Sequence, residues 1–217
     1  MIYGNLTIVL RTICMANAIL YVVAEWSRWT TVRSISKLAA STAFVALAIA
    51  NGAAGSAYGR LILLALIFSW VGDALLLSLR SPFLLAGIAA FFLAHAAFGA
   101  AFASQRLDAM WLAIALVILS AGAFAFLRWL WTYLQPFYKI AVPLYLAAIT
   151  VMTSLAISSS AASMSPLLAT AAITFTASDI SVARNRFVER SLANKIWGVP
   201  LYYTAQILFA MSVLSHG

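Results

Sequence analysis

The chain contains very little charge. Only 8% of its 217 residues are Asp, Glu, Lys or Arg, whereas 65% are hydrophobic, and the mean hydropathy is +1.02. A soluble fold of this length would expose far more apolar surface than water tolerates, but a lipid bilayer accepts such a composition. The composition therefore excludes a soluble globular protein and indicates an integral membrane protein.

Other features that the sequence lacks exclude further structural classes. A single cysteine, Cys14, excludes an intramolecular disulfide framework. The alternating polar and apolar residues of a transmembrane β-barrel are missing, because the apolar stretches are continuous and about 20 residues long. The first apolar stretch has neither the basic start nor the cleavage pattern of a signal peptide, so we expect a retained helix there. The connections are too short for a soluble domain. We therefore predict an all-α fold with one transmembrane domain over residues 1–217.

Charge, Gly, Pro and Ser divide the apolar sequence into eight segments, which predict a bundle of eight transmembrane helices. They cover roughly 6–24, 34–51, 58–78, 82–104, 109–128, 137–157, 165–183 and 196–215.

Lys and Arg are unevenly divided between the two sides of this predicted bundle. The odd-numbered connections and adjoining helix ends hold ten of them (Arg28, Arg33, Lys37, Arg80, Arg128, Lys139, Arg184, Arg186, Arg190 and Lys195), and the even-numbered connections hold two (Arg60 and Arg106). The positive-inside rule then predicts cytoplasmic odd-numbered connections and both termini outside. We expect the protein in a bacterial inner membrane. The net charge of +8 is scattered between apolar spans, which favours membrane lipids over nucleic acid as partners.

Asp73 and Asp179 are the two acidic residues placed deep inside apolar segments. Ionisable residues at such positions are costly and commonly functional. In the predicted topology both segments descend from the outside, and each aspartate lies about five residues before the inner end, so both share one depth. The alternative is structural, in which each carboxyl bonds a neighbouring helix and fixes packing.

Several further polar residues fall in the same inner half of the predicted bundle. Lys37 is either an interfacial anchor or a cation that pairs with an aspartate. Tyr145 and Tyr203 either belong to an aromatic belt or face the aspartates, and Gln206 needs a polar partner inside its apolar segment.

His95 lies near the predicted midplane and is a proton shuttle, a metal ligand or a core histidine. The chain offers only His216 as a second histidine, so a zinc site is disfavoured, and two aspartates with one histidine around a divalent cation is a weaker alternative. We predict no metal and no cofactor.

Five motifs resemble, in order and spacing, the lysoplasmalogenase-like (YhhN) family of eight-helix membrane proteins: Phe68–Leu77, Phe91–His95, Val142–Tyr145, Phe175–Asp179 and Tyr203–Gln206. Ser36–Leu38 resembles the Lys-Pro element of that family without its proline. The resemblance covers residues 34–212. It implies hydrolysis of the vinyl ether bond of lysoplasmalogens, which are lysophospholipids, to a fatty aldehyde and glycerophospho-ethanolamine or glycerophospho-choline.

Vinyl ether hydrolysis needs an acid and an anion, which two carboxylates in a dry pocket can supply if their surroundings differ. We interpret Asp73 as the ionised carboxylate, particularly if Lys37 reaches it, and Asp179 as the acid. Tyr145, Tyr203 and Gln206 would position water or the glycerol oxygens of the substrate, and His95 would relay protons. The hydrocarbon chain is expected among Phe91, Phe92, Phe98 and Phe175.

Two alternatives to this enzyme remain at this stage. A proton-coupled transporter could use the same carboxylates, and it predicts inverted repeats and discontinuous helices. A purely structural bundle predicts that replacing either aspartate changes stability more than activity.

Overall fold

A computed structural model of the protein describes residues 2–78 and 80–216. Within these residues the chain forms eight α-helices and no β-strand: α1 (Ile2–Trp26), α2 (Thr30–Ala50), α3 (Ala57–Leu75), α4 (Ser81–Ala103), α5 (Ala109–Leu130), α6 (Tyr138–Ser163), α7 (Leu167–Ala183) and α8 (Leu192–His216). Three short helical turns complete the described structure: η1 (Ala53–Gly55), η2 (Trp131–Tyr133) and the π-helical η3 (Arg184–Val188). The all-α prediction is confirmed.

Seven of the described helices, α1 to α6 and α8, are long and apolar enough to cross a membrane. The remaining helix, α7, has 17 residues, and η3 continues it by 5 residues. The structure therefore supports an integral membrane protein. That α7 crosses the membrane as an eighth span stays a prediction.

Local sequence explains where several helices begin and end. The Ser56 side chain accepts a hydrogen bond from the backbone N–H of Gly59 at the start of α3, and Asp108 does the same for Trp111 at the start of α5. Pro82 lies in the first turn of α4, where its missing N–H costs nothing. Gly52 follows α2 with a φ of 83°, a left-handed conformation that glycine adopts without strain.

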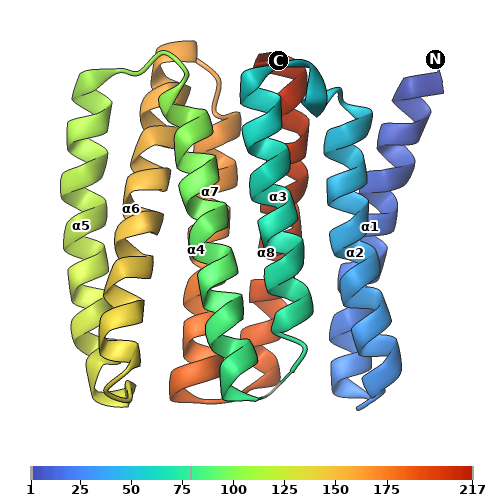
Figure 1. Ribbon diagram of the computed structural model, residues 1–217, viewed down its shortest axis with the longest axis vertical. Coiled ribbons are helices and arrows are strands. Elements are labelled where there is room, and N and C mark those ends of the chain that lie inside the picture. The colour runs from blue at the N-terminus through green and yellow to red at the C-terminus, as the bar shows by residue number, and fades with distance from the viewer. Residues whose placement is uncertain (1, 79, 217) are drawn as a thin grey trace.

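The helices lie side by side with nearly parallel axes (Figure 1). α1 packs on α2 and α8, α3 packs on α2, α4 and α8, and α7 packs on α6 and α8. α5 lies at one side of the molecule and packs on α6. The interior is rich in aromatic rings, including Phe98, Phe102, Phe175 and Phe209, which contact one another between α4, α7 and α8.

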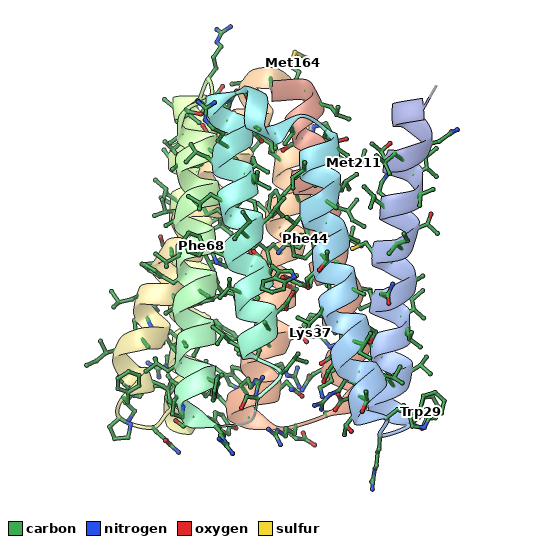
Figure 2. All side chains as sticks on the ribbon, turned by 45° about the vertical axis from the view of Figure 1, so that its right-hand side comes forward. Trp29, Lys37, Phe44, Phe68, Met164 and Met211 are labelled. Atoms are coloured by element: carbon green, nitrogen blue, oxygen red, sulfur yellow. The ribbon has the colours of Figure 1, made fainter. Side chains whose placement is uncertain are left out.

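The start of α1 and the end of α8 lie at the same end of the molecule (Figure 1). The opposite end carries the connections that follow α1, α3, α5 and α7, and it is called the basic end below. Of the ten Lys and Arg residues counted above, all but Lys37 lie in or beside these connections. Figure 2 shows Trp29 at the basic end, Met164 at the other end, and Lys37 some way in from Trp29. Lys37 is thus placed inside the molecule rather than at its rim.

Candidate functional site

A cavity of about 550 Å³ occupies the half of the molecule nearer the basic end. All eight helices contribute residues to its wall. Asp73 of α3 and Asp179 of α7 both line it, although α3 and α7 share no extended packing interface. The two aspartates therefore reach one cavity from helices that α4 and α8 separate.

Asp73 is 2% exposed and is surrounded by groups that favour a carboxylate. The ammonium of Lys37 on α2 lies 3.1 Å from Oδ1 of Asp73. Oδ2 accepts hydrogen bonds from the hydroxyl of Ser41 at 2.6 Å and from the hydroxyl of Tyr202 on α8 at 2.8 Å. A cation and two hydrogen-bond donors are the surroundings that stabilise a carboxylate.

Tyr203 belongs to the second layer around Asp73. Its hydroxyl donates to the backbone carbonyl of Lys37 at 3.2 Å and lies 3.3 Å from the hydroxyl of Ser41. The Ser41 hydroxyl lies 3.0 Å from the same Lys37 carbonyl. Tyr203 thereby fixes the backbone that carries Lys37 and the serine that bonds Asp73.

Asp179 lies among groups of a different kind. The hydroxyl of Tyr145 on α6 donates to its Oδ2 at 3.2 Å, and Nε2 of His95 on α4 lies 3.2 Å from the same oxygen. The histidine and carboxylate atoms approach without the alignment of a full hydrogen bond. The described residues place no lysine or arginine in an ion pair with this carboxyl.

The contacts of His95 determine where a proton must lie. Nδ1 is 2.7 Å from the carbonyl oxygen of Phe91, and because a carbonyl only accepts, Nδ1 carries a hydrogen. Nε2 then faces Asp179 as a second acceptor unless one of the two groups holds a further proton. Two acceptors this close repel each other, and a proton on either group would remove that repulsion.

Aromatic rings link the surroundings of the two aspartates. The Tyr202 ring contacts the rings of Phe91 and Phe175 at centroid distances of 5.9 and 5.8 Å. The His95 ring stacks on Phe175 at 4.6 Å with an interplanar angle of 16°. Tyr202 therefore bonds Asp73 with its hydroxyl and packs with its ring toward the surroundings of Asp179.

At the basic end the cavity wall becomes cationic. Glu25 pairs with Arg33, at 3.5 Å, and with Lys195. Arg186 and Arg190 also line the cavity, and within the described residues neither is paired with a carboxylate. Arg186 donates to the carbonyl oxygen of Leu76 at the end of α3. Burial, and then the like charges of Arg190 and Arg33, lower the pKa of the Arg186 guanidinium, so an anion is favoured beside it.

The YhhN family model matches residues 32–213 of the sequence. The chain belongs to the YhhN family. Comparisons with curated proteins and with solved structures found no match. The matched region of this YhhN protein begins near the start of α2 and includes both aspartates and their hydrogen-bond partners, whereas α1 lies outside it.

The structure places the predicted site residues of this YhhN protein in two groups. Lys37 and Tyr203 surround Asp73, and His95 and Tyr145 surround Asp179. His95 is 1% exposed and is not part of the cavity wall, but it contacts two residues of that wall, Asp179 and Tyr145.

Gln206 is joined to neither group. It is fully buried outside the cavity wall, and within the described residues its amide atoms form no hydrogen bond. The structure therefore does not supply the polar partner that the sequence predicted for Gln206.

Two of the residues that complete the site were missed from the sequence. Ser41 and Tyr202 both donate to Asp73. Tyr202 is adjacent to Tyr203 in the chain, and the only available signal was that both tyrosines fall at the depth of the aspartates. The divalent-cation alternative is not formed, because within the described residues no three His, Cys, Asp or Glu side chains come together.

The four phenylalanines predicted to surround the hydrocarbon chain do not gather around the cavity. Of the four, only Phe91 lines the cavity. Phe98 and Phe175 are fully buried in the aromatic core, because they pack on Phe209 rather than facing a cavity, and Phe92 is exposed on the outside of α4.

Proposed function

We propose that this YhhN protein is a membrane-embedded hydrolase that cleaves the vinyl ether bond of lysoplasmalogens. The products are a fatty aldehyde and glycerophospho-ethanolamine or glycerophospho-choline. The observation that carries the proposal is that one cavity holds two carboxyl groups in contrasting surroundings, the buried Asp73 beside a lysine and the half-buried Asp179 beside a histidine.

The reaction begins with proton delivery to the β-carbon of the vinyl ether. This step leaves a positive charge shared between the neighbouring carbon and the ether oxygen. Water then adds to that carbon and loses a proton, and the resulting hemiacetal separates into aldehyde and alcohol. The site must therefore hold one proton ready and stabilise one cation, as in glycosidases with carboxyl pairs.

Asp179 is the group that we assign to proton delivery. In this proposal Asp179 and His95 share a proton, which is available at the cavity wall because Asp179 lines the cavity and His95 does not. After transfer, His95 and Tyr145 stabilise the new carboxylate. Because the same pair can accept a proton from the attacking water, the site returns to its first state.

Asp73 is the group that we assign to cation stabilisation. Lys37, Ser41 and Tyr202 hold its charge in place before the reaction, so little reorganisation is needed when the cation forms. Since Lys37 offsets part of that charge, the carboxylate is expected to act mainly by orienting water and the cationic carbon rather than as a strong nucleophile.

Arg186 and Arg190 are expected to receive the phosphate of the headgroup. They line the same cavity near the basic end without carboxylate partners, and guanidinium groups bind phosphate through paired hydrogen bonds. A lysophospholipid placed in this way would have its ether bond deeper in the cavity, toward the aspartates.

The experiment that tests the proposal follows fatty-aldehyde release from lysoplasmalogen by purified wild type, Asp73→Asn and Asp179→Asn. Each substitution removes a group that acts in the chemical step, so kcat should fall by about 10²–10⁴-fold. Asp108→Asn is the matched control. Asp108 caps α5 at the opposite end and does not line the cavity, so its variant should keep wild-type activity.

Activity that survives both substitutions would remove the two-carboxylate mechanism. Loss of stability in place of activity would favour a structural role for the aspartates. For the transporter alternative the described structure gives no support, because α3 and α7 run without a break past Asp73 and Asp179.

A further inference from the structure

The cavity has an apolar arm that leads away from the aspartates. Its wall is formed by Leu84 and Ile88 on α4, by Ile118, Leu119, Gly122, Ala123 and Phe126 on α5, and by Leu146 and Ile149 on α6. The α5 residues fall on one face at helical spacing, as do those of α4. An apolar wall of this kind fits a hydrocarbon and offers nothing to a polar ligand.

The arm reaches the outside of the molecule between α4 and α5. α5 packs on α6, whereas α4 and α5 share no extended packing interface, and Figure 1 shows the two helices apart with α6 behind. Ile118 lines the arm and is 63% exposed, so the wall continues onto the lipid-facing surface.

Gly122 lies on the wall of the arm, where a large side chain would project into open space. A Cβ atom added at Gly122 would meet no atom within 4 Å, so the space beside it is open. Ile88 on α4 lines the other side of the arm.

We propose that this arm binds the single hydrocarbon chain of the substrate and admits it sideways from the bilayer between α4 and α5. The inference rests on the proposed function, because the cleaved bond must lie at the aspartates, where the arm begins. The arm and the cationic end of the cavity together match an amphiphile with one chain and one charged headgroup.

Access from the basic end is unsuitable for such a chain. Arg33, Arg186, Arg190 and Lys195 line the cavity there, and a hydrocarbon passing them would leave the bilayer and separate charged groups from water. Sideways access avoids this cost, because the lipid tails and the arm are equally apolar.

The test uses a hexadecyl lysophosphatidylcholine with a saturated ether bond and a diazirine midway along its chain. A saturated ether has no double bond to protonate and is not cleaved, so cross-linking reports binding independently of turnover. After irradiation of the protein in vesicles, peptide mapping should place the cross-links on residues of the arm such as Ile88, Leu119 and Phe126.

Gly122→Phe should lower this cross-linking roughly tenfold by filling the arm. Gly122→Ala is the matched control and should leave the yield unchanged, since nothing stands where its methyl group would lie. Ile88→Trp should close the arm from the α4 side, and it keeps the test decisive if Gly122→Phe fails to fold.

Cross-links found only on outward-facing residues such as Val117 and Phe124, with a yield that neither substitution changes, would overturn the chain site. A wild type that cross-links as expected but cleaves no vinyl ether would refute the hydrolase and leave the chain site standing. Aspartate-dependent hydrolysis without cross-links in the arm would support the hydrolase and refute the chain site.

Discussion

At the scale of single residues, the Lys37–Asp73 pair is the most constrained feature of the site. The two side chains are 12% and 4% exposed, and their charged atoms are 3.1 Å apart. When one partner of a buried ion pair is removed, the other charge remains buried and uncompensated, which typically costs about 3–5 kcal/mol. When both are replaced by neutral groups, most of that cost disappears.

We therefore expect Lys37→Met to lower the free energy of unfolding by about 3 kcal/mol, and Lys37→Met combined with Asp73→Asn to restore most of it. The measurement is reversible unfolding in detergent, followed by tryptophan fluorescence. Arg33→Met is the control, because its pair with Glu25 is more exposed and should contribute no more than about 1 kcal/mol. Equal losses in the single and double variants would show that the pair is not buried as a unit.

The sequence alone pointed to both aspartates and predicted that Lys37, Tyr145 and Tyr203 lie at the same depth in the bundle. Depth can be predicted because it follows from the position of a residue along a helix whose direction across the membrane is predicted. The sequence could not assign contacts around the helix axis. Neighbouring residues in a helix differ by about 100° in direction, so only coordinates show that Tyr202, and not Tyr203, donates to Asp73.

At the scale of helices, the close approach of α7 and α8 positions Asp179. A Cβ atom added at Gly198 of α8 would overlap the side chain of Ser181 on α7, and the Ser181 hydroxyl donates to the carbonyl of Asn194. Small residues let helices in membranes approach closely, and here the contact lies within one turn of Asp179.

Gly198→Ala should therefore push α7 away from α8. We expect a loss of about 1–3 kcal/mol in unfolding free energy, as for other overpacked interfaces, together with slower aldehyde release because Asp179 moves with α7. Thermal unfolding in detergent and the aldehyde assay check the two parts. Gly122→Ala is the control, since the same methyl group there meets open space. An unchanged melting temperature for Gly198→Ala would mean that the interface relaxes freely.

Helix existence was predictable, but several helix boundaries were not, and the end of α6 departs the most. The sixth segment was expected to end near residue 157, whereas α6 continues to Ser163. Serines 158–160 resemble a loop in the sequence, but they are buried. The Ser158 hydroxyl donates to the carbonyl of Asp108, and the Ser160 hydroxyl accepts from the N–H of Ala169. Tertiary hydrogen bonds of this kind have no signature in composition.

At the scale of the whole molecule, the site depends on an asymmetry between the two ends. The cavity runs from cationic residues at the basic end to an apolar arm between α4 and α5. The charge bias was readable from the sequence, because Lys and Arg accumulate in alternate connections. The apolar arm could not be predicted from the sequence, because it exists only where α4 and α5 do not pack on each other. The same bias predicts that the basic end, and with it the mouth of the cavity, faces the cytoplasm.

Labelling of single cysteines in intact cells by a membrane-impermeant thiol reagent tests this orientation. Ser104→Cys lies on the exposed connection between α4 and α5, and Thr132→Cys lies on η2 at the basic end. We expect the first to be labelled from outside and the second only after the membrane is permeabilised, because the Lys and Arg residues of the basic end favour the cytoplasmic side. Wild type is the control, since its Cys14 is fully buried. The opposite pattern would place the cavity mouth outside, and the lysophospholipid headgroup would then have to come from the outer leaflet.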